Sequence, residues 1–133
     1  MAKILLVEDD SLMIRLYQKT FTFDGFDVVV AQDGEEGLVK AKLEKPTLIL
    51  LDVMMPKMNG LEVLKRLKND PETKSIPVVI LTNLAGEHDA QEALSYGAIR
   101  YIVKSEQEPR GVTKIVEEIL AGYTRGEIPK AAV

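Results

Sequence analysis

The sequence predicts an α/β fold, a five-stranded parallel sheet with helices on both faces. Two observations predict it. Short apolar runs alternate with helix-like segments along the whole chain of 133 residues. In addition, the runs 3–7 and 47–51 are apolar after their first residue, which is typical of strands buried on both faces of a parallel sheet. Strands and helices that alternate in this way are joined by right-handed crossovers.

The predicted elements follow one another in strict alternation. We expect strands at residues 3–8, 27–31, 47–52, 77–82 and 99–103. We expect helices at residues 11–23, 34–44, 60–69, 87–97 and 110–122. Pro46 and Pro71 fall in the predicted connections, where a residue without an N–H group is tolerated.

Capping signals and periodicity support individual elements, taken in chain order. Asp33 and Glu36 have the spacing of a capping box that opens the second helix. Leu61, Leu64 and Leu67 form an apolar stripe along the third helix.

Proline and glycine then mark two further boundaries. Pro77 starts the fourth strand, because proline is tolerated at the first residue of a strand. Gly97 is expected to end the fourth helix as a cap glycine. The last helix has the clearest pattern, an apolar face formed by Val112, Ile115, Val116, Ile119 and Leu120.

The composition excludes several classes of protein. With 46% hydrophobic and 29% charged residues, the chain is typical of soluble globular proteins. Its net charge of −4 argues against direct binding to nucleic acid or to an anionic membrane. It contains no cysteine and no run long enough to span a membrane, and we expect no signal peptide. We expect a cytoplasmic domain over residues 1–122 and a short flexible tail over 123–133.

Acidic side chains follow two of the buried strands. Glu8 and Asp9 follow the first apolar run, and Asp52 follows the third strand's run. Two strand orders compete at this chain length, and the flavodoxin-like order 2-1-3-4-5 places the first and third strands side by side. In that order, Glu8, Asp9 and Asp52 meet at the carboxyl edge of the sheet, where open α/β sheets bind ligands.

These acids predict a site for a hard divalent cation. Oxygen ligands without histidine or cysteine suit magnesium. Lys104 follows the fifth strand and reaches the same edge, and carboxylates, a metal ion and a lysine are the components of a phosphoryl-transfer site. Asp10 has two interpretations, a further metal ligand or, the favoured one, an acid that interacts with the dipole of the first helix.

Five motifs lie at the predicted strand ends or in the loops that follow them. They are Val7-Glu8-Asp9-Asp10, Leu51-Asp52-Val53-Met54-Met55-Pro56, Asn59-Gly60, Leu81-Thr82 and Tyr101-Ile102-Val103-Lys104. In this order they resemble the receiver domain of two-component response regulators. Among these, the chain is similar to the single-domain regulators of the chemotaxis type. The resemblance covers about residues 2–122.

The resemblance implies a role for each site residue. Asp52 would be the phosphoacceptor, and its donor a sensor histidine kinase, a histidine phosphotransfer protein or a small phosphodonor. Mg²⁺ would be bound by Asp9 and Asp52, by Glu8 through a water, and by the backbone carbonyl of Met54.

The resemblance also implies a switch. Lys104 and Thr82 would contact phosphoryl oxygens, and Thr82 would move toward the phosphoryl group while Tyr101 turns inward. This movement would change the surface formed by the fourth helix, the fifth strand and the fifth helix.

Two residues next to the site depart from the family pattern. Ser105 follows Lys104 where proline is usual, so the isomer of the 104–105 peptide bond is left open. Asn83 follows Thr82 where a small residue is usual. A third departure is the polar run 105–110 before the last helix.

Three functions compete on this evidence. The leading one is a phosphorylation-dependent switch that docks to an unidentified downstream protein, either as a monomer or as a dimer linked to phosphorylation. The alternative is a pseudo-receiver, an interaction module that keeps the fold without the switch, as Ser105 and Asn83 suggest. A multiple-turnover hydrolase of the aspartyl-phosphate type is disfavoured, because Met54 stands where such enzymes carry a second acid.

Overall fold

Strands and helices alternate throughout residues 2–124, the part of the chain that the structure, a computed structural model, describes. The strands are β1 (Lys3–Val7), β2 (Asp27–Ala31), β3 (Leu48–Leu51), β4 (Val78–Thr82) and β5 (Arg100–Val103). The helices are α1 (Ser11–Phe23), α2 (Gly34–Glu44), α3 (Gly60–Asn69), α4 (Glu87–Ser95) and α5 (Pro109–Thr124). All ten predicted elements are present, with bounds that agree to within two residues.

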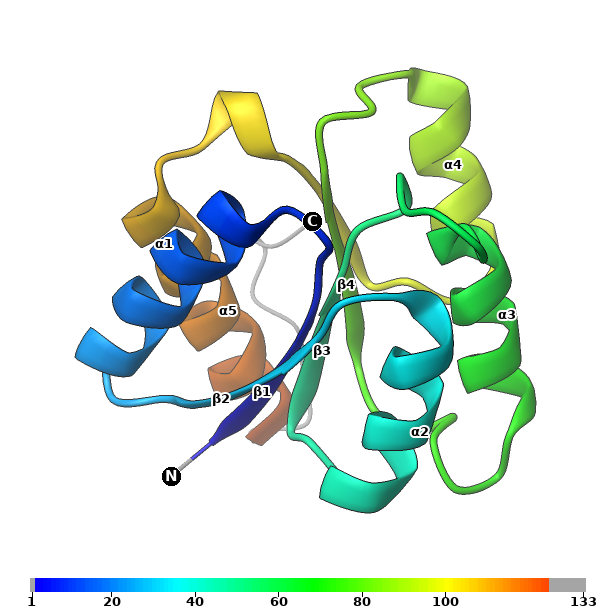
Figure 1. Ribbon diagram of the computed structural model, residues 1–133, viewed down its shortest axis with the longest axis horizontal. Helices are drawn as coiled ribbons and strands as arrows, with labels where there is room; N and C mark the ends of the chain where they lie inside the picture. Colours follow the sequence, from blue (N-terminus) through cyan, green and yellow to red (C-terminus); the bar gives the residue numbers. More distant parts are fainter. Residues whose placement is uncertain (1, 125–133) are drawn as a thin grey trace.

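The five strands form one parallel sheet in the order β2-β1-β3-β4-β5, as predicted (Figure 1). β1 lies between β2 and β3, and its last residue, Val7, is in register with Leu51 at the end of β3. The residues that follow these two strands are therefore neighbours. This is the point where the strand order reverses, and it is where sheets of this type bind their ligands.

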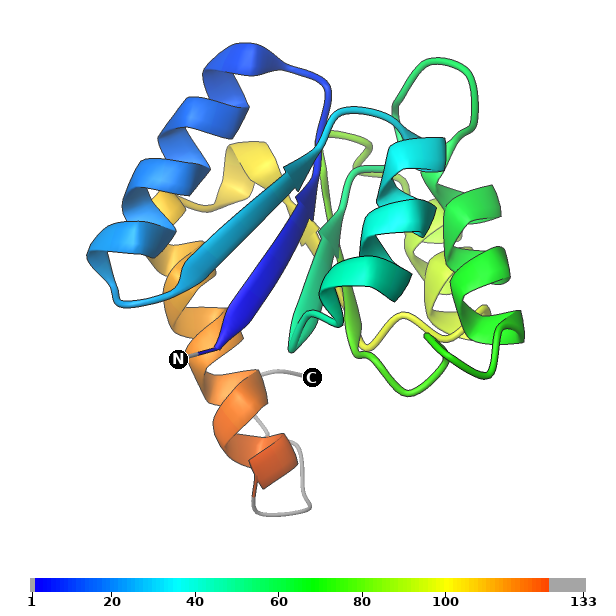
Figure 2. The same cartoon turned by 60° about the horizontal axis from the view of Figure 1, so that its bottom comes forward.

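Helices cover both faces of the sheet. α1 and α5 lie on one face, and α2, α3 and α4 lie on the other (Figures 1 and 2). Because successive strand residues point to opposite faces, the core has two halves. Leu6 belongs to the half that contains Phe21 and Ile119, whereas Leu5 belongs to the half that contains Leu64.

Side chains cap the first two helices. Asp10 is the N-cap of α1, and its carboxylate accepts hydrogen bonds from the N–H groups of Leu12 and Met13 at 2.9 and 3.3 Å. Asp33 caps α2 by accepting from the N–H of Glu36 at 2.9 Å. The return bond differs from that of a standard capping box, because Glu36 accepts from the N–H of Gln32.

The fourth helix ends as the sequence predicts, near a glycine. Gly97 has φ of +110°, a conformation that favours glycine, and it follows the last helical residue of α4 by two positions. Its N–H donates to the carbonyl of Leu94 at 3.1 Å. The helix therefore stops at Ser95, slightly before the predicted end at 97.

Two features near the C-terminal end were not predicted. A 3₁₀ helix, η1 (Lys104–Glu106), separates β5 from α5. α5 continues to Thr124, so its last turn extends into the segment predicted to be a tail, and residues 125–133 of that segment lie outside the described residues. Within residues 2–124, no helix is long and apolar enough to cross a membrane.

Candidate functional site

Backbone hydrogen bonds place Glu8 and Asp52 next to each other at the carboxyl edge of the sheet. The N–H of Glu8 donates to the carbonyl of Ala31, and the N–H of Asp52 donates to the carbonyl of Val7, at 2.9 and 3.1 Å. Both bonds continue the pattern of the parallel ladder past the ends of the strands. Both residues are buried.

A third acid, Asp9, completes the cluster from the exposed side. One carboxylate oxygen from each of Glu8, Asp9 and Asp52 lies within 4.8 Å of the other two. Three converging carboxylates offer a hard cation the oxygen ligands it prefers, and the exposed position of Asp9 leaves a path from solvent. The acids therefore fit the predicted magnesium site. Asp10 instead caps α1, in line with the favoured interpretation from the sequence.

Lys104 supplies the positive charge inside this cluster. Its Nζ donates to Oε1 of Glu8 and, at 2.9 Å, to Oδ2 of Asp52. The three side chains are 8%, 2% and 8% exposed, so this is a buried ion triad. Removal of one member from such a group leaves uncompensated charge in a medium of low dielectric constant.

The local environment shifts the pKa values of Glu8 and Lys104. Burial raises the pKa of Glu8, because the charged form loses its hydration, and the hydrogen bond and charge of Lys104 offset only part of that effect. Burial by itself would lower the pKa of Lys104. Its hydrogen bonds to Glu8 and Asp52, together with the negative charges of these two groups, outweigh burial, so the pKa of Lys104 lies above its usual value and the ammonium stays charged.

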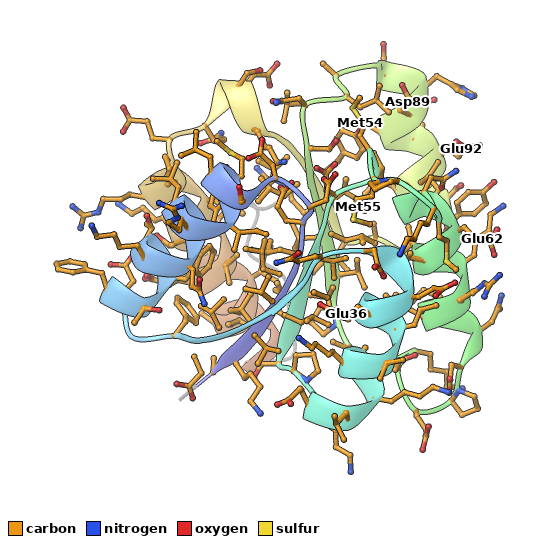
Figure 3. All side chains as sticks on the ribbon, viewed as in Figure 1. Glu36, Met54, Met55, Glu62, Asp89 and Glu92 are labelled. Carbon is orange, nitrogen blue, oxygen red and sulfur yellow. The ribbon has the colours of Figure 1, made fainter. Side chains whose placement is uncertain are left out.

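The loop after β3 orients the carboxylate of Asp52. The N–H of Met54 donates to Oδ1 of Asp52 at 2.9 Å, while Lys104 holds the other oxygen, Oδ2. The side chain of Met54 is 57% exposed and lies at the carboxyl edge of the sheet, the end at which Asp89 of α4 is also found (Figure 3). Gly60 closes this loop with a bond from its N–H to the carbonyl of Val53 at 3.0 Å.

The two predicted switch residues are linked through the backbone of Leu84. Thr82, the fully buried last residue of β4, accepts a hydrogen bond from the N–H of Leu84 at 3.3 Å. The hydroxyl of Tyr101, on β5, donates to the carbonyl of the same residue at 2.5 Å. Thr82 and Tyr101 thus contact one segment of the β4–α4 loop.

The two departures from the family pattern contact each other. The backbone N–H of Ser105 donates to Oδ1 of Asn83 at 3.1 Å. The peptide bond between Lys104 and Ser105 is trans, since residues 2–124 contain no cis peptide bond. No pattern in the sequence indicates this contact, because Asn83 lies in the β4–α4 loop and Ser105 lies in the 3₁₀ helix after β5, 22 positions away.

Comparison with known proteins decides the family. A sequence model described as the response regulator receiver domain matches residues 4–116. The chain belongs to the response regulator receiver family. Receiver domains are the phosphoacceptor signalling domains of two-component systems and not typical enzymes, they bind Mg²⁺ in general, and they interact with histidine kinases or phosphotransfer proteins.

Relatives of the receiver family agree with this assignment. The alkaline phosphatase synthesis transcriptional regulatory protein PhoP of Bacillus subtilis is 42% identical over 118 residues, which are 89% of this chain and 48% of PhoP. The chain thus spans about half the length of that relative.

Solved structures share the fold of this receiver domain. The chemotaxis protein CheY4 of Vibrio cholerae has a TM-score of 0.82 and 32% identity, over 88% of this chain and 97% of that one. The phosphorylated cyanobacterial phytochrome response regulator RcpA has a TM-score of 0.80 and 34% identity, over 92% and 95% of the two chains.

Proposed function

We propose that this receiver domain is a phosphorylation-dependent signalling switch whose phosphoacceptor is Asp52. One observation carries the proposal: the carboxylate of Asp52 is buried, oriented by Lys104 and Met54, and next to two further acids. The phosphodonor would be the phosphohistidine of a sensor kinase or of a histidine phosphotransfer protein, or a small phosphodonor. The phosphorylated state of the relative RcpA supports the same chemistry here.

In the proposed reaction, an oxygen of Asp52 attacks the phosphorus atom and forms an acyl phosphate. The bond from phosphorus to the donor breaks, and the donor leaves with the electron pair. Glu8, Asp9, Asp52 and the carbonyl of Met54 would hold Mg²⁺, which supplies positive charge for the phosphoryl oxygens when bound. Lys104, already in contact with Asp52, would transfer one of its hydrogen bonds to a phosphoryl oxygen.

The proposed output lies on the surface formed by α4, β5 and α5. The hydroxyl of Thr82 would donate to a phosphoryl oxygen, and its bond from the N–H of Leu84 would then change. Because Tyr101 donates to the carbonyl of Leu84, movement of this loop would also alter the position of Tyr101. Phosphorylation shifts such an equilibrium only by the difference in its contacts with the two states.

The partners in this proposal are proteins. A histidine kinase or phosphotransfer protein would act at Asp52, and an unidentified downstream protein would bind the α4–β5–α5 surface. Direct contact with nucleic acid or membrane is not part of the proposal, because the chain carries a net charge of −4. We retain from the sequence a cytoplasmic location and a monomer or a phosphorylation-linked dimer.

Intact-protein mass spectrometry tests the proposal. After incubation with acetyl phosphate and Mg²⁺, we expect one phosphoryl adduct on the natural chain. The adduct should be absent for Asp52→Ala, and it should not form when a chelator removes Mg²⁺. If neither acetyl phosphate nor a cognate kinase phosphorylates the natural chain, the pseudo-receiver interpretation is correct instead. Continuous turnover of a phosphate ester would instead indicate an enzyme.

Magnesium should also stabilise the folded protein. A ligand that binds only the folded state at about one hundred times its Kd stabilises that state by about 2.7 kcal/mol, so thermal unfolding in MgCl₂ should shift upward by several degrees. Asp9→Asn should abolish this shift, because it removes a ligand at an exposed position. Asp10→Asn is the matched control, since asparagine also caps helices and the shift should remain. An identical shift in both variants would contradict the metal assignment.

A further inference from the structure

We propose that Asn83 is a positioning residue for Lys104. Oδ1 of Asn83 accepts a hydrogen bond from the backbone N–H of Ser105 at 3.1 Å. Asn83 directly follows Thr82, and Ser105 directly follows Lys104. The bond thus joins the two segments that present the threonine hydroxyl and the lysine ammonium. The inference rests on the proposed function, in which both groups contact the phosphoryl group.

The sheet does not hold these two segments together beyond the strand ends. The last register pair between β4 and β5 is Thr82 with Val103. The chain then leaves the ladder, because Lys104 begins η1. At the end of η1, the bond from the N–H of Gln107 to the carbonyl of Lys104 is long, at 3.3 Å. The side chain of Asn83 therefore connects the segment after β4 to the segment after β5 at a point where the backbone ladder has ended.

The direction of the Lys104 side chain depends on this region of backbone. A lysine ammonium is a point charge on a flexible stem of four carbons, so its reach is determined by where the backbone is held. Here the ammonium must lie 2.9 Å from Oδ2 of Asp52 and also contact Glu8. Small displacements of a positioned group lower reaction rates considerably.

The two residue types suit this contact. The donor is a backbone N–H, which every residue except proline supplies, and serine supplies it at position 105. The acceptor is a side-chain amide oxygen. Both residues are exposed, so neither side chain contributes to the packing of the core. Replacement of Asn83 by alanine should therefore remove this hydrogen bond and leave the protein folded.

Four chains test the inference: the natural protein, Asn83→Ala, Asn83→Asp and Ser105→Ala. The phosphorylation rate is measured by intact mass with acetyl phosphate in saturating Mg²⁺. We expect Asn83→Ala to be slower by about three- to tenfold, the rate change that corresponds to one hydrogen bond. Ser105→Ala keeps the backbone N–H and should react at the natural rate.

Two further measurements separate positioning from general damage to the site. Hydrogen exchange of the amide at position 105, followed by NMR, should become faster in Asn83→Ala and stay slow in Asn83→Asp, which keeps an acceptor oxygen. The affinity for Mg²⁺ should not weaken in Asn83→Ala, because its predicted ligands are other residues.

Clear outcomes would overturn the inference. An Asn83→Ala chain that is phosphorylated at the natural rate contradicts it, and so does a slower rate accompanied by weaker Mg²⁺ binding. If the amide at position 105 exchanges at the same rate in Asn83→Ala as in the natural chain, the hydrogen bond to Asn83 does not exist in solution. These results leave the proposed function intact, since that function fails only if the natural chain forms no adduct.

Discussion

Replacement of Lys104 by methionine is expected to destabilise the metal-free protein by about 3–5 kcal/mol, because it leaves two buried carboxylates without their cation. Methionine keeps most of the apolar stem of lysine, so the loss of stability measures the contribution of the charge and not that of the packing. The side chain of Lys104 is 8% exposed, and its ammonium is the charge that Glu8 and Asp52 share. Urea unfolding in the presence of a chelator measures the change.

The pH dependence of this variant is a second signature. Burial already raises the pKa of Glu8 in the natural protein, and loss of Lys104 removes the charge that opposes this effect. A carboxyl whose pKa is higher in the folded state takes up a proton on folding. The stability of Lys104→Met should therefore increase as the pH falls from about 8 to about 5.5, and saturating Mg²⁺ should restore part of the loss at the higher pH.

The matched control is the same substitution at an exposed ion pair. Lys42 contacts Asp70 at 2.7 Å, but its side chain is 52% exposed. Lys42→Met should therefore lower the stability far less than Lys104→Met does, because solvent screens an exposed ion pair. If Lys104→Met and Lys42→Met lower the free energy of unfolding equally, Lys104 does not neutralise a buried cluster.

Replacement of Gly60 by alanine is expected to cost about 3 kcal/mol or more, because the added methyl group has no space. A Cβ at this position would lie 2.3 Å from the carbonyl oxygen of Asp52 and 2.5 Å from Cα of Val53. Both are backbone atoms, which cannot rotate away as the end of a side chain can. The variant must shift the segment that carries Asp52, the proposed phosphoacceptor.

We therefore expect Gly60→Ala to lose activity as well as stability. Displacement of the Asp52 backbone should reduce the phosphorylation rate by about a hundredfold. Gly111→Ala is the control: its Cβ would meet the end of the flexible Gln107 side chain, and alanine is favoured in a helix. That variant should be as stable as the natural chain or gain up to about 1 kcal/mol. Normal phosphorylation of Gly60→Ala would contradict the predicted clash.

The fold was predictable because its signals are local or periodic. Buried strands appear as apolar runs, Asp33 and Gly97 mark helix boundaries, and the alternation of elements implies a parallel sheet. The approach of Glu8, Asp9 and Asp52 follows from the strand order and from the position of each acid after its strand. That part of the site therefore follows from topology.

The remaining contacts depend on side-chain direction and loop shape, for which the sequence carries no periodic signal. Lys104 was expected at the same edge, but its contact with Glu8 depends on how its long stem is turned. The bond from Tyr101 to Leu84 and the bond from Ser105 to Asn83 each join the β4–α4 loop to a segment far away in the sequence. The 3₁₀ helix after β5 likewise had no recognisable signal.

The distance along the chain between members of the ion triad has a consequence for biosynthesis. Lys104 and Glu8 are 96 positions apart, and Lys104 and Asp52 are 52 apart. A nascent chain leaving the ribosome thus exposes its acids long before the lysine that neutralises them has been translated. Until β5 is in place, Lys104 neither offsets the repulsion between Glu8 and Asp52 nor orients Asp52, the proposed nucleophile. In the proposed function, the chain therefore gains a phosphoacceptor oriented by Lys104 only after its last strand has been synthesised and folded.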